Sequence, residues 1–543
     1  MGAPRNSNAD IDVLVVGAGP VGLTAALLLH ALGLSVEIID QRDGPQRAPA
    51  AHVVNARTFE IWRQLGLDLD HLLGMAKDPA DAGAVHWVTQ LGGEVIGSLP
   101  FERQGDDVLA LTPTPLRNLS QHKLEPVLRD ELAARGIPVR YEHRWESAVQ
   151  GPDRVDSTVA HGDVRSQRSS RWLLACDGAG SPVRRWLGIE PIGPRSIQSF
   201  LMVHLAADFR AAVGDAPGVI YWVCDPSSGG TFVAHDIDRE WVYMYPFDPD
   251  VEDASAFTTE RCEAMVRAAL ADPGLAFSVL AVRTWVMTAQ VAERYRDGRV
   301  FLVGDAAHRF PPTGGLGLNT GVQDAHNLVW KLAAVERGGD PDGLLDTYES
   351  ERRPVAQRNA DVSLDNAMKL IEVPIALGAD PVLEVAAANL REVLASQERR
   401  EIAVAAIANQ ATHFDMLGLQ LGYTYDLTGT DQPDAPGHDP VREYVPICAP
   451  GARLPHGWVQ RDGVRISSLD LVPIDQPIVI CGPAATAIDG VAAVRVGTDF
   501  VDPDGWWTAT MGQSPDSAVL VRPDQHIAAC LNVRPGVGDH QRS

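Results

Sequence analysis

The chain has 543 residues, which is too long for one simple hydrophobic core, so two or three domains are expected. Hydrophobic residues make up 45% and charged residues 22% of the sequence, as is typical of soluble globular proteins. The formal net charge of −25 argues against nucleic acid and against an anionic membrane surface as partners, because both are bound through basic patches.

The N-terminal segment is polar, and it lacks the apolar core of a signal peptide. The apolar run at 11–34 contains Asp12 and an internal Gly-Ala-Gly-Pro, which predict a strand, a turn and a buried helix and argue against a membrane span. The six cysteines are scattered, with no CxxC pair and no histidine at metal-ligand spacing. We therefore expect reduced thiols, no metal site and a cytoplasmic protein.

Residues 13–40 predict a β-α-β unit that binds a dinucleotide. Its GxGxxG glycines follow an apolar strand and would let a diphosphate approach the N-terminus of the next helix. The second strand ends at Asp40, 18 residues beyond Gly22, where a carboxylate would accept from a ribose 2′-hydroxyl. These features favour FAD or NAD over NADP and do not separate FAD from NAD. The expected contacts are Gly17, Gly19, Pro20, Val21, Gly22, Asp40 and Gln41.

Residues 219–247 contain three short β-rich runs separated by turn residues. In the last run, period-two alternation places four aromatic side chains on one face of the strand. They are Trp241, Tyr243, Tyr245 and Phe247. These side chains could line a binding site, although core packing is the simpler interpretation for any single one of them.

The stretch at 304–325, GDAAHRFPPTGGLGLNTGVQDA, places five glycines and two adjacent prolines between a strand at 299–303 and a helix at 320–335. Asp305 directly follows the strand, where a carboxylate can hold a sugar-like hydroxyl. The glycines would let bare backbone lie against a flat ring. The helix N-terminus favours negative charge, such as that on the N1–C2=O edge of a reduced flavin. This stretch therefore favours FAD over NAD as the bound cofactor.

Three segments together resemble the fingerprints of the single-component FAD-dependent aromatic hydroxylases. They are GAGPVG at 17–22, CDGAGSPVRR at 176–185 and the glycine-rich stretch with its helix at 304–332. Within that family, the chain is most similar to phenol and chlorophenol hydroxylases and to polyketide hydroxylases of the aklavinone type. The resemblance extends over nearly the whole chain.

The resemblance implies an α/β fold with a discontinuous Rossmann-type FAD domain at 1–190 and 285–365. A β-rich substrate domain would occupy 191–284, and a helical connection would follow at 366–430. Residues 440–543 resemble the thioredoxin-like C-terminal domain of these enzymes. Because this domain lacks CxxC, we expect it to serve packing or homodimer contact without redox chemistry.

The remaining cofactor contacts follow from the same resemblance. Arg47 would reach the pyrophosphate, and Gln121 would lie on the ribityl and phosphate side of the flavin. Asp177 and Arg184 belong to the fingerprint that the family associates with both FAD and NAD(P)H. Asp305 would hold the ribityl chain. The flavin ring would be contacted by Pro312, Gly317, Leu318 and Asn319.

Three residues are implied in catalysis. Phenol hydroxylases carry an active-site tyrosine on the strand that corresponds to 241–245, and Tyr243 is the best match. His52 lies five positions before Arg57, where these enzymes have an ionisable residue, and a histidine there could take a phenolic proton near neutral pH. His235 is a second candidate, and His308 is expected to be structural.

The resemblance implies a monooxygenase in which NAD(P)H reduces FAD and O₂ then forms a flavin C4a-hydroperoxide. That species would hydroxylate a small phenol-like aromatic or polyketide substrate. Two alternatives remain open. One is Baeyer–Villiger oxidation or epoxidation of a polyketide with the same flavin. The other is a non-catalytic, flavin-binding redox sensor that contacts a partner through its C-terminal tail. The substrate and the choice between NADPH and NADH also stay open.

Overall fold

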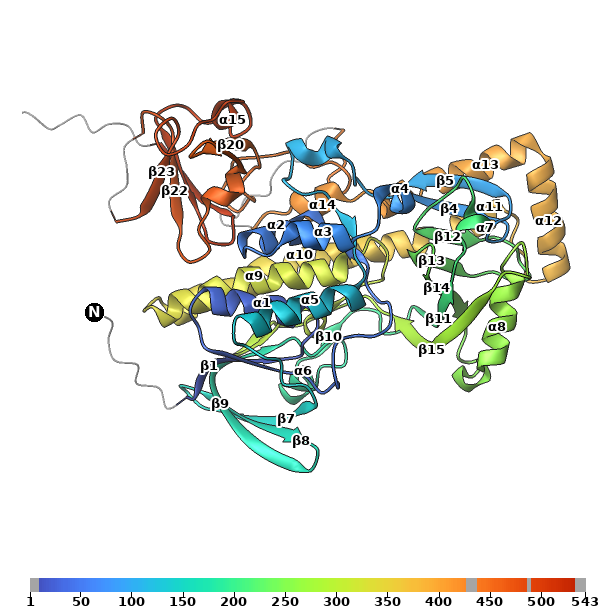
Figure 1. The fold of residues 1–543 in the computed structure, drawn as a ribbon, viewed down its shortest axis with the longest axis horizontal. Helices are drawn as coiled ribbons and strands as arrows, with labels where there is room; N and C mark the ends of the chain where they lie inside the picture. Colours follow the sequence, from blue (N-terminus) through green and yellow to red (C-terminus); the bar gives the residue numbers. More distant parts are fainter. Residues whose placement is uncertain (1–8, 426–436, 486–489, 533–543) are drawn as a thin grey trace, which may run out of the picture.

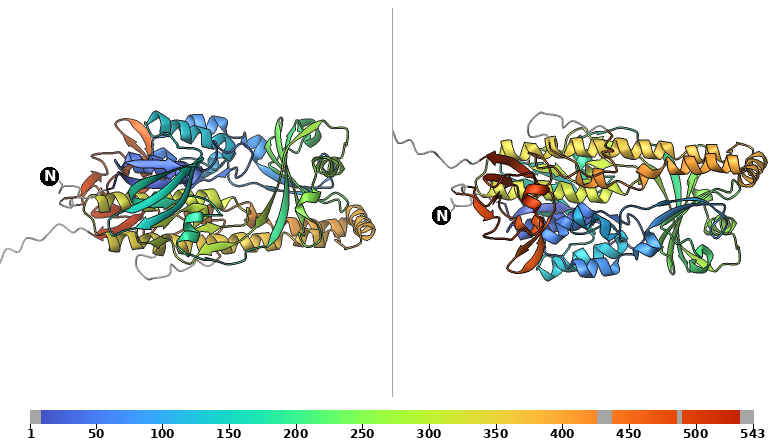
Figure 2. Two further views of the ribbon diagram at one scale, coloured as in Figure 1. Left: turned by 90° about the horizontal axis from the view of Figure 1, so that it is seen from below. Right: turned by 90° about the horizontal axis from the view of Figure 1, so that it is seen from above.

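Two seven-stranded sheets lie toward opposite ends of an elongated molecule, and long helices run between them (Figure 1, Figure 2). The computed structural model describes residues 9–425, 437–485 and 490–532. The C-terminal domain, red in Figure 1, lies beside the helices at the end of the molecule that holds the first sheet.

The first sheet is the predicted dinucleotide-binding core. Its main strands run in the order β17 (Arg296–Asp297), β18 (Val300–Leu302), β9 (Val164–Ala175), β1 (Ile11–Val16) and β2 (Val36–Ile39), with β8 (Val155–His161) and β7 (His143–Gln150) continuing from β9. The four strands from β18 to β2 are parallel. Val13, Leu14 and Val15 are fully buried, as expected for a parallel strand that is covered on both faces.

The helices of this domain pack beside one another above the sheet in Figure 1, with α1 (Pro20–Ala31) between α5 (Gln121–Ala134) and α9 (Leu316–Glu336). Helix α10 (Pro341–Lys369) packs on α9. Helix α9 begins four residues before the expected start at 320, because Gly315 adopts a left-handed φ of 61° and ends the loop there. Gly321 then lies within the helix, and a Cβ at this position would approach Val21 to 2.6 Å, so α9 depends on glycine to pack this closely.

The second sheet is antiparallel except where β12 meets β4. Its strands run in the order β15 (Phe277–Met287), β11 (Gln198–Ala207), β14 (Glu240–Phe247), β13 (Thr231–Asp236), β12 (Ile220–Val223), β4 (Ala84–Val88) and β5 (Val95–Pro100). The last two strands come from the N-terminal segment that was expected to lie wholly in the FAD domain. The two domains are therefore interleaved in sequence more closely than expected, since part of the N-terminal segment completes the substrate sheet.

Each face of the second sheet has its own core. On one face, Tyr243, Trp241 and Phe232 pack with residues of α8 (Thr259–Ala268). On the other face, Trp87 and Phe101 pack with residues of three helices of the predicted helical connection. These helices are α11 (Glu372–Ala376), α12 (Leu383–Ala395) and α13 (Gln397–Ala408).

Short elements join the two sheets. A three-stranded sheet contains β10 (Pro191–Ile192), β16 (Gln290–Ala292) and β19 (His308–Arg309), and β3 (Val53–Val54) pairs with β6 (Arg117–Asn118). The remaining short helices are α2 (Ala56–Gln64), α3 (Leu69–Met75), α4 (Pro79–Ala82), α6 (Pro182–Trp186), α7 (Arg210–Val213) and α14 (Leu417–Leu421), with 3₁₀ turns at Asp106–Ala110, Ala254–Ala256, Gly304–Ala306 and Ala411–His413.

The C-terminal domain is built on a four-stranded sheet. Its strands run in the order β23 (Ala492–Arg495), β22 (Ile478–Cys481), β24 (Ser517–Val521) and β25 (Ile527–Asn532). A hairpin of β20 (Trp458–Arg461) and β21 (Val464–Ser467), a 3₁₀ turn at Ser468–Leu471 and helix α15 (Trp506–Ala509) complete the described part. The Sγ atoms of Cys448 and Cys530 lie 3.7 Å apart in this domain.

Buried ion pairs tie the C-terminal domain to the FAD domain. Arg453 donates from Nε to Glu60 of α2 at 2.8 Å, and Glu60 also pairs with Arg57 at 2.9 Å. Arg522 pairs with Glu351 of α10 at 2.7 Å. Leaving any of these buried charges without its partner would be strongly destabilising. The tail therefore packs as an integral part of the molecule.

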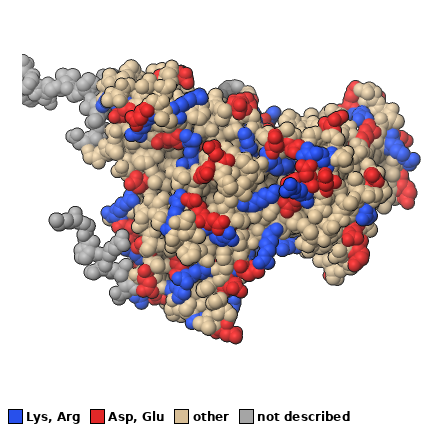
Figure 3. Space-filling model, in the orientation of Figure 1, with Lys and Arg blue, Asp and Glu red and all other residues tan. Residues whose placement is uncertain are grey.

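Charged side chains of both signs are interspersed on the face of the molecule shown in Figure 3, without one dominant basic patch. Throughout 9–425, 437–485 and 490–532, no helix combines the length and the apolar character that crossing a bilayer requires.

Candidate active site

The glycine loop between β1 and α1 contains one open position flanked by two closed ones. A Cβ at Gly17 would lie 2.2 Å from the carbonyl oxygen of Cys176, and one at Gly22 would lie 1.9 Å from that of Gly17. A Cβ at Gly19 would meet no atom within 4 Å. Gly19 is also the N-cap of α1, and no side chain caps the helix there. The loop therefore offers bare backbone and uncapped N–H groups to a diphosphate, and Pro20 and Val21 open the helix behind it.

Asp40 braces this loop from behind. Its Oδ2 accepts a hydrogen bond from the Ala18 N–H at 2.7 Å, and its Oδ1 accepts from the Arg42 N–H at 2.8 Å. The Arg42 guanidinium also pairs with Asp40 at 3.0 Å and with Glu125 at 3.2 Å. Gln121 donates to Glu125 from Nε2 at 2.8 Å. The carboxylate of Asp40 is thus already engaged, and its ribose contact stays a prediction.

Arg42 and Glu125 were missed by the sequence analysis, because no motif marks them. Two neighbouring residues that were predicted to bind the cofactor lie further out. The Arg47 side chain is 76% exposed and pairs with Asp43 at 2.7 Å, and Gln41 is also exposed. Neither side chain is brought to the glycine loop by a contact in the described structure.

The second fingerprint is connected to the third. Asp177 accepts from the Val183 N–H at 3.1 Å, and burial raises the pKa of its carboxyl to about 6. Arg184 donates to the carbonyl oxygens of Ala306 at 2.8 Å and Ala179 at 3.0 Å. Arg184 therefore fixes the turn after β18, on which Asp305 lies.

Asp305 is held by fewer hydrogen bonds than Asp40 and Asp177, the other two carboxylates predicted to contact the cofactor. Its side chain is accessible to solvent, and within the described ranges no group donates a hydrogen bond to it. The surrounding protein nevertheless desolvates it enough to raise its pKa. A Cβ at Gly317 would have only Asp305 Oδ1 within 4 Å, at 3.8 Å, so this carboxylate and the first turn of α9 border the same open space.

The first turn of α9 is free to receive a ligand. Its N-cap is Gly315, which has no side chain, so the backbone N–H groups of Gly317 and Leu318 have no side-chain partner at the cap. Pro312 is exposed, and its carbonyl accepts from the Gly315 N–H at 3.1 Å, which closes the turn. An acceptor for a ribityl hydroxyl thus lies beside donors for a carbonyl edge, and these groups fit FAD.

Asn319 connects the flavin-side loop to the segment after His52. Its Oδ1 accepts from the Asn55 N–H at 2.9 Å and from the Thr58 hydroxyl at 2.8 Å. Its Nδ2 donates to the carbonyl oxygens of Val53 at 2.9 Å and Gly315 at 2.7 Å. Its side chain is therefore fully used in positioning this segment, and only its backbone remains for the flavin.

His308 lies beneath the loop and pairs through Nε2 with Asp324 at 2.7 Å. Asp324 also pairs with Arg352 at 2.8 Å and accepts from the Gly304 N–H at 3.2 Å. All three side chains are buried. The structural role expected for His308 agrees with these contacts.

The structure brings the two predicted catalytic histidines together. The ring centroids of His52 and His235 lie 5.3 Å apart in an edge-to-face arrangement. Burial lowers the pKa of His52 to about 4, although a hydrogen bond to Asn118 opposes this, and burial beside His52 lowers that of His235 well below its usual value. Both imidazoles are therefore uncharged at neutral pH and can act as acceptors.

The hydrogen-bond network determines which nitrogen of His52 carries the proton. Gln104 donates from Nε2 to the carbonyl oxygens of Ala82 at 2.9 Å and Phe101 at 3.0 Å, so its Oε1 must accept from Asn118 Nδ2 at 3.2 Å. Asn118 Oδ1 then accepts from His52 Nδ1–H at 2.8 Å. The Nε2 lone pair of His52 is left free for a substrate.

Tyr243 lies on the opposite face of the second sheet from His235. It pairs with Phe232 across β13 and β14, and the alternation of β13 points His235 to the other side. The Tyr243 hydroxyl donates to the carbonyl oxygens of Ser228 and Gly229, each at 3.2 Å, and burial raises its pKa. These contacts support a packing role for Tyr243, in place of the substrate contact that the resemblance implied.

A row of aromatic rings leads away from His52. Successive ring centroids lie 6.5 Å apart from His52 to Phe101, 6.1 Å from Phe101 to Phe414, 6.0 Å from Phe414 to Trp87 and 6.2 Å from Trp87 to Trp222. The three middle rings are buried, whereas His52 and Trp222 remain partly accessible. This row was not predicted, because its members come from three distant parts of the sequence.

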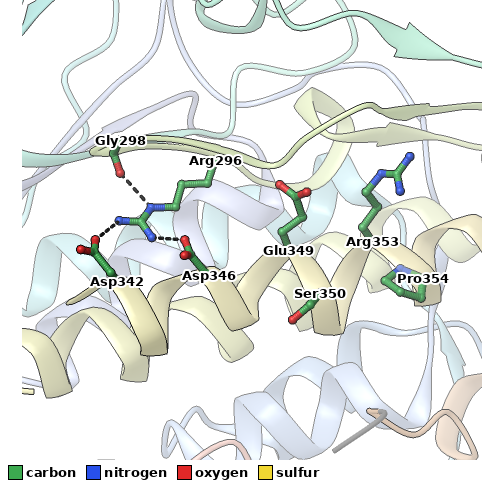
Figure 4. A pocket seen from close by; sticks show the side chains of 8 residues that line it. All are labelled: Arg296, Gly298, Asp342, Asp346, Glu349, Ser350, Arg353 and Pro354. Atoms are coloured by element: carbon green, nitrogen blue, oxygen red, sulfur yellow. Dashed lines mark hydrogen bonds and ion pairs between the residues drawn. The ribbon is translucent and has the colours of Figure 1, made fainter. Parts of the chain in front are cut away.

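A pocket at the surface of α10 has a different character (Figure 4). Its lining residues are Arg296, Gly298, Asp342, Asp346, Glu349, Ser350, Arg353 and Pro354. The guanidinium of Arg296 pairs with Asp346 and donates to the Gly298 carbonyl oxygen at 2.9 Å. This pocket contains no aromatic ring and none of the predicted site residues, so the His52–His235 pair remains the candidate active site.

Two family models match the chain. One, described as an FAD binding domain, matches residues 10–363, and the other, described as the C-terminal domain of aromatic-ring hydroxylases, matches residues 448–539. The tetracenomycin A2 monooxygenase-dioxygenase of Streptomyces glaucescens is 33% identical over 96% of this chain and 93% of its own length. The 2,4-dichlorophenol 6-monooxygenase of Delftia acidovorans is 31% identical over 98% of this chain and 97% of its own length.

Solved structures are similar over the same extent. The flavin-dependent monooxygenase PieE, in complex with FAD and substrate, has a TM-score of 0.90 and 32% identity over 97% of both chains. Aklavinone-11 hydroxylase, in a ternary complex with FAD and aklavinone, has a TM-score of 0.80 and 30% identity over 97% of both chains.

Proposed function

The chain belongs to the FAD-binding-domain family and is an FAD-dependent monooxygenase that uses NAD(P)H to hydroxylate a phenol-like aromatic or polyketide substrate, and we propose that this substrate presents a phenolic hydroxyl to the His52–His235 pair. The observation that supports this proposal is the contact between His52 and His235. Two uncharged imidazoles meet at the end of a row of aromatic rings, close to the loop that connects to the flavin-side helix.

The groups that would hold FAD come mainly from backbone. The open Gly19 loop takes the diphosphate, Asp305 the ribityl chain, and the N–H groups of Gly317 and Leu318 the pyrimidine edge of the ring. Gln121, Asp40 and Asp177 complete the proposed set of contacts. When bound, FAD would accept electrons from NAD(P)H and activate O₂.

The histidines act on the substrate's proton. An uncharged imidazole accepts the proton of a phenol, and the resulting phenolate is a better nucleophile than the neutral ring. An imidazolium cannot accept this proton, so the lowered pKa values of His52 and His235 keep both imidazoles available as bases at neutral pH. The buried rings of the aromatic row keep water away from one side of the histidines, and His52 is the partly accessible ring at this end that a flat substrate can reach.

The test uses the FAD-loaded enzyme with NADPH or NADH, ¹⁸O₂, and two probe phenols, 2,4-dichlorophenol and aklavinone. We expect a product that carries one labelled oxygen on an intact ring, together with faster oxidation of the nicotinamide when the phenol is present. A ring-expanded ester or an epoxide would contradict hydroxylation and support the Baeyer–Villiger or epoxidising alternative. A yellow protein that no phenol stimulates, but whose binding to a partner protein follows the flavin's redox state, would support the sensor alternative.

A further inference from the structure

His235 stands at the head of a continuous chain of hydrogen bonds. Its Nδ1 lies 2.9 Å from the hydroxyl of Ser120, and the same hydroxyl lies 2.9 Å from Nδ1 of His122. His122 Nε2 then lies 3.1 Å from Glu240 Oε2. These four side chains come from β13, from the start of α5 and from β14, so the tertiary fold alone brings them into line.

The direction of each bond follows from the far end. Although burial opposes it, hydrogen bonds from His122 and His204 hold the pKa of Glu240 well below its usual range, so Glu240 is a carboxylate at neutral pH. It therefore accepts from His122 Nε2–H, and His122 Nδ1 accepts from the Ser120 hydroxyl. Ser120 in turn accepts from His235 Nδ1–H, which leaves the Nε2 lone pair of His235 free.

The two histidines of the site differ in what lies behind them. The Nδ1–H of His52 donates to the amide oxygen of Asn118, which cannot take up a proton and pass it on. The Nδ1–H of His235 donates to a hydroxyl, which can accept one proton while it releases another. Only the second arrangement can move a proton away from the substrate.

Building on the proposed function, we propose that His235, Ser120 and His122 form a proton relay that moves a proton from the buried phenol to His122, where the partly exposed Glu240 stabilises the positive charge. The exposed fraction of the side chain is 14% for His122 and 18% for Glu240, whereas His235 is buried. The chain of bonds thus leads from the interior toward solvent.

The transfer balances at every step. The substrate's O–H bond breaks as its proton joins His235 Nε2, the Nδ1 proton of His235 moves to Ser120 Oγ, and the original hydroxyl proton of Ser120 moves to His122 Nδ1. The substrate becomes a phenolate, His235 ends neutral in its other tautomer, and His122 becomes an imidazolium that Glu240 stabilises. The reverse sequence returns the proton to the product hydroxyl and restores the chain.

Other charged groups face this chain. Lys77 donates from Nζ to the Ala234 carbonyl oxygen at 2.8 Å, and burial lowers its pKa to about 8. Lys123 and Asp236 lie 3.9 Å apart beside it, and His204 donates to the second oxygen of Glu240 at 3.0 Å. Lys77 is positive at neutral pH. Its charge therefore stabilises a phenolate bound at the site and destabilises the protonated forms of His52 and His235.

A substitution at Ser120 tests the relay with the least disturbance of the fold. It occupies the N-cap of α5, yet its hydroxyl makes no capping bond, so Ser120→Ala removes the relay bond without removing a helix cap. Ser120→Thr restores a hydroxyl. The matched control is Ser98→Ala, because Ser98 makes a similar bond to Nδ1 of His86, at 2.7 Å, that has no link to the pair.

We expect Ser120→Ala to lower kcat for 2,4-dichlorophenol by about 10²-fold, the low end of what a positioned acid–base group contributes, with little change in KM. The loss should shrink as pH rises toward the pKa of the free phenol, where solvent removes the proton. Ser120→Thr and Ser98→Ala should resemble wild type. If the Ser120 variants do not fold, Glu240→Gln at the more exposed end should act in the same direction.

A second readout needs no turnover. 4-Nitrophenol bound to the oxidised FAD-loaded enzyme, without NAD(P)H, should ionise at lower pH in wild type and in Ser120→Thr than in Ser120→Ala, as seen by difference absorbance. Equal ionisation in all three proteins would overturn the relay. Relay-dependent ionisation without oxygenation of any phenol would contradict the proposed function and leave the relay standing, and failure to bind 4-nitrophenol would count against both.

Discussion

Around Gly19 the protein presents mainly backbone, whereas around His235 it presents side chains from separate elements of the fold. In the first region, two glycines are required because neighbouring carbonyl oxygens leave no room for a Cβ, and the third is open. In the second region, the histidines depend on Asn118, Ser120 and their partners for their tautomers. Sterically demanding positions thus define the cofactor end of the site, and a hydrogen-bond network defines the substrate end.

The largest effect should come from a methyl group in the glycine loop. Gly22→Ala places a Cβ 1.9 Å from the Gly17 carbonyl oxygen, a backbone atom that cannot move aside, so we expect a loss of about 3 kcal/mol or more and no retained FAD. Gly19→Ala should fold with apoprotein stability within about 1 kcal/mol of wild type but bind FAD weakly. Thermal unfolding of both apoproteins, followed by FAD titration, checks this. Equal stability of the two variants would contradict the distinction between closed and open glycines.

The substrate end should respond to acid. The pKa of His52 is about 4 in the folded protein against an ordinary value of 6.5, so the unfolded chain binds the extra proton first as pH falls. Stability contributed by this group is full above pH 6.5 and declines until about pH 4, by about 2 kcal/mol between pH 7 and pH 5 at 1.36 kcal/mol per pKa unit. His52→Asn should lose that much less stability over the same interval in urea titrations. An unchanged pH dependence in this variant would show that His52 is not desolvated.

Asp305→Ala tests whether the flavin side depends on side chains at all. It removes the acceptor for a ribityl hydroxyl, a loss of about 1–3 kcal/mol, and should weaken FAD binding about tenfold or more. Asp305→Asn keeps an acceptor oxygen and should fall between the two. Flavin fluorescence during titration of the apoproteins gives the dissociation constants. Full FAD retention by Asp305→Ala would show that the Asp305 carboxylate does not hold the cofactor.

The smallest effect is expected at Tyr243. Tyr243→Phe removes two hydrogen bonds of 3.2 Å to backbone carbonyl oxygens, which corresponds to about 1 kcal/mol of stability, while the ring stays packed against Phe232. The ratio of hydroxylated product to released peroxide should not change between pH 6 and 9. A marked fall in that ratio would return Tyr243 to the substrate site.

The sequence predicted the strands, helices and glycine turns around the cofactor end because their determinants are local. The spacing of Gly17, Gly19 and Gly22 after a strand, and of Asp305 before a glycine-rich turn, is contained in short segments, and the strands and helices around them lie where they were expected. The earlier start of α9 is the exception. The helix starts where Gly315 adopts a left-handed φ of 61°, and the sequence pattern did not show which of the glycines in this stretch would do so.

The substrate end was predictable only in part. The alternation that places Trp241 and Tyr243 on one face was correct, but α8 covers that face, and only the tertiary packing decides this. His122 directly follows the predicted Gln121 and still carried no signal, because its partners Ser120, His235 and Glu240 become relevant only when three elements meet. A proton path made of such contacts has no sequence pattern.

The docking of the C-terminal domain also sets an order of events at the ribosome. Arg57 in α2 donates to the carbonyl oxygen of Asp524, which is synthesised 467 residues later, and Glu60 in the same helix awaits Arg453. At a synthesis rate of about 5–20 residues per second, Asp524 is made roughly half a minute to a minute and a half after α2. Asn55 at the start of that helix bonds Asn319 of the flavin-side loop. The contacts that fix α2, and through Asn55 the flavin-side loop, are therefore incomplete during translation. We expect FAD to bind after the finished chain is released.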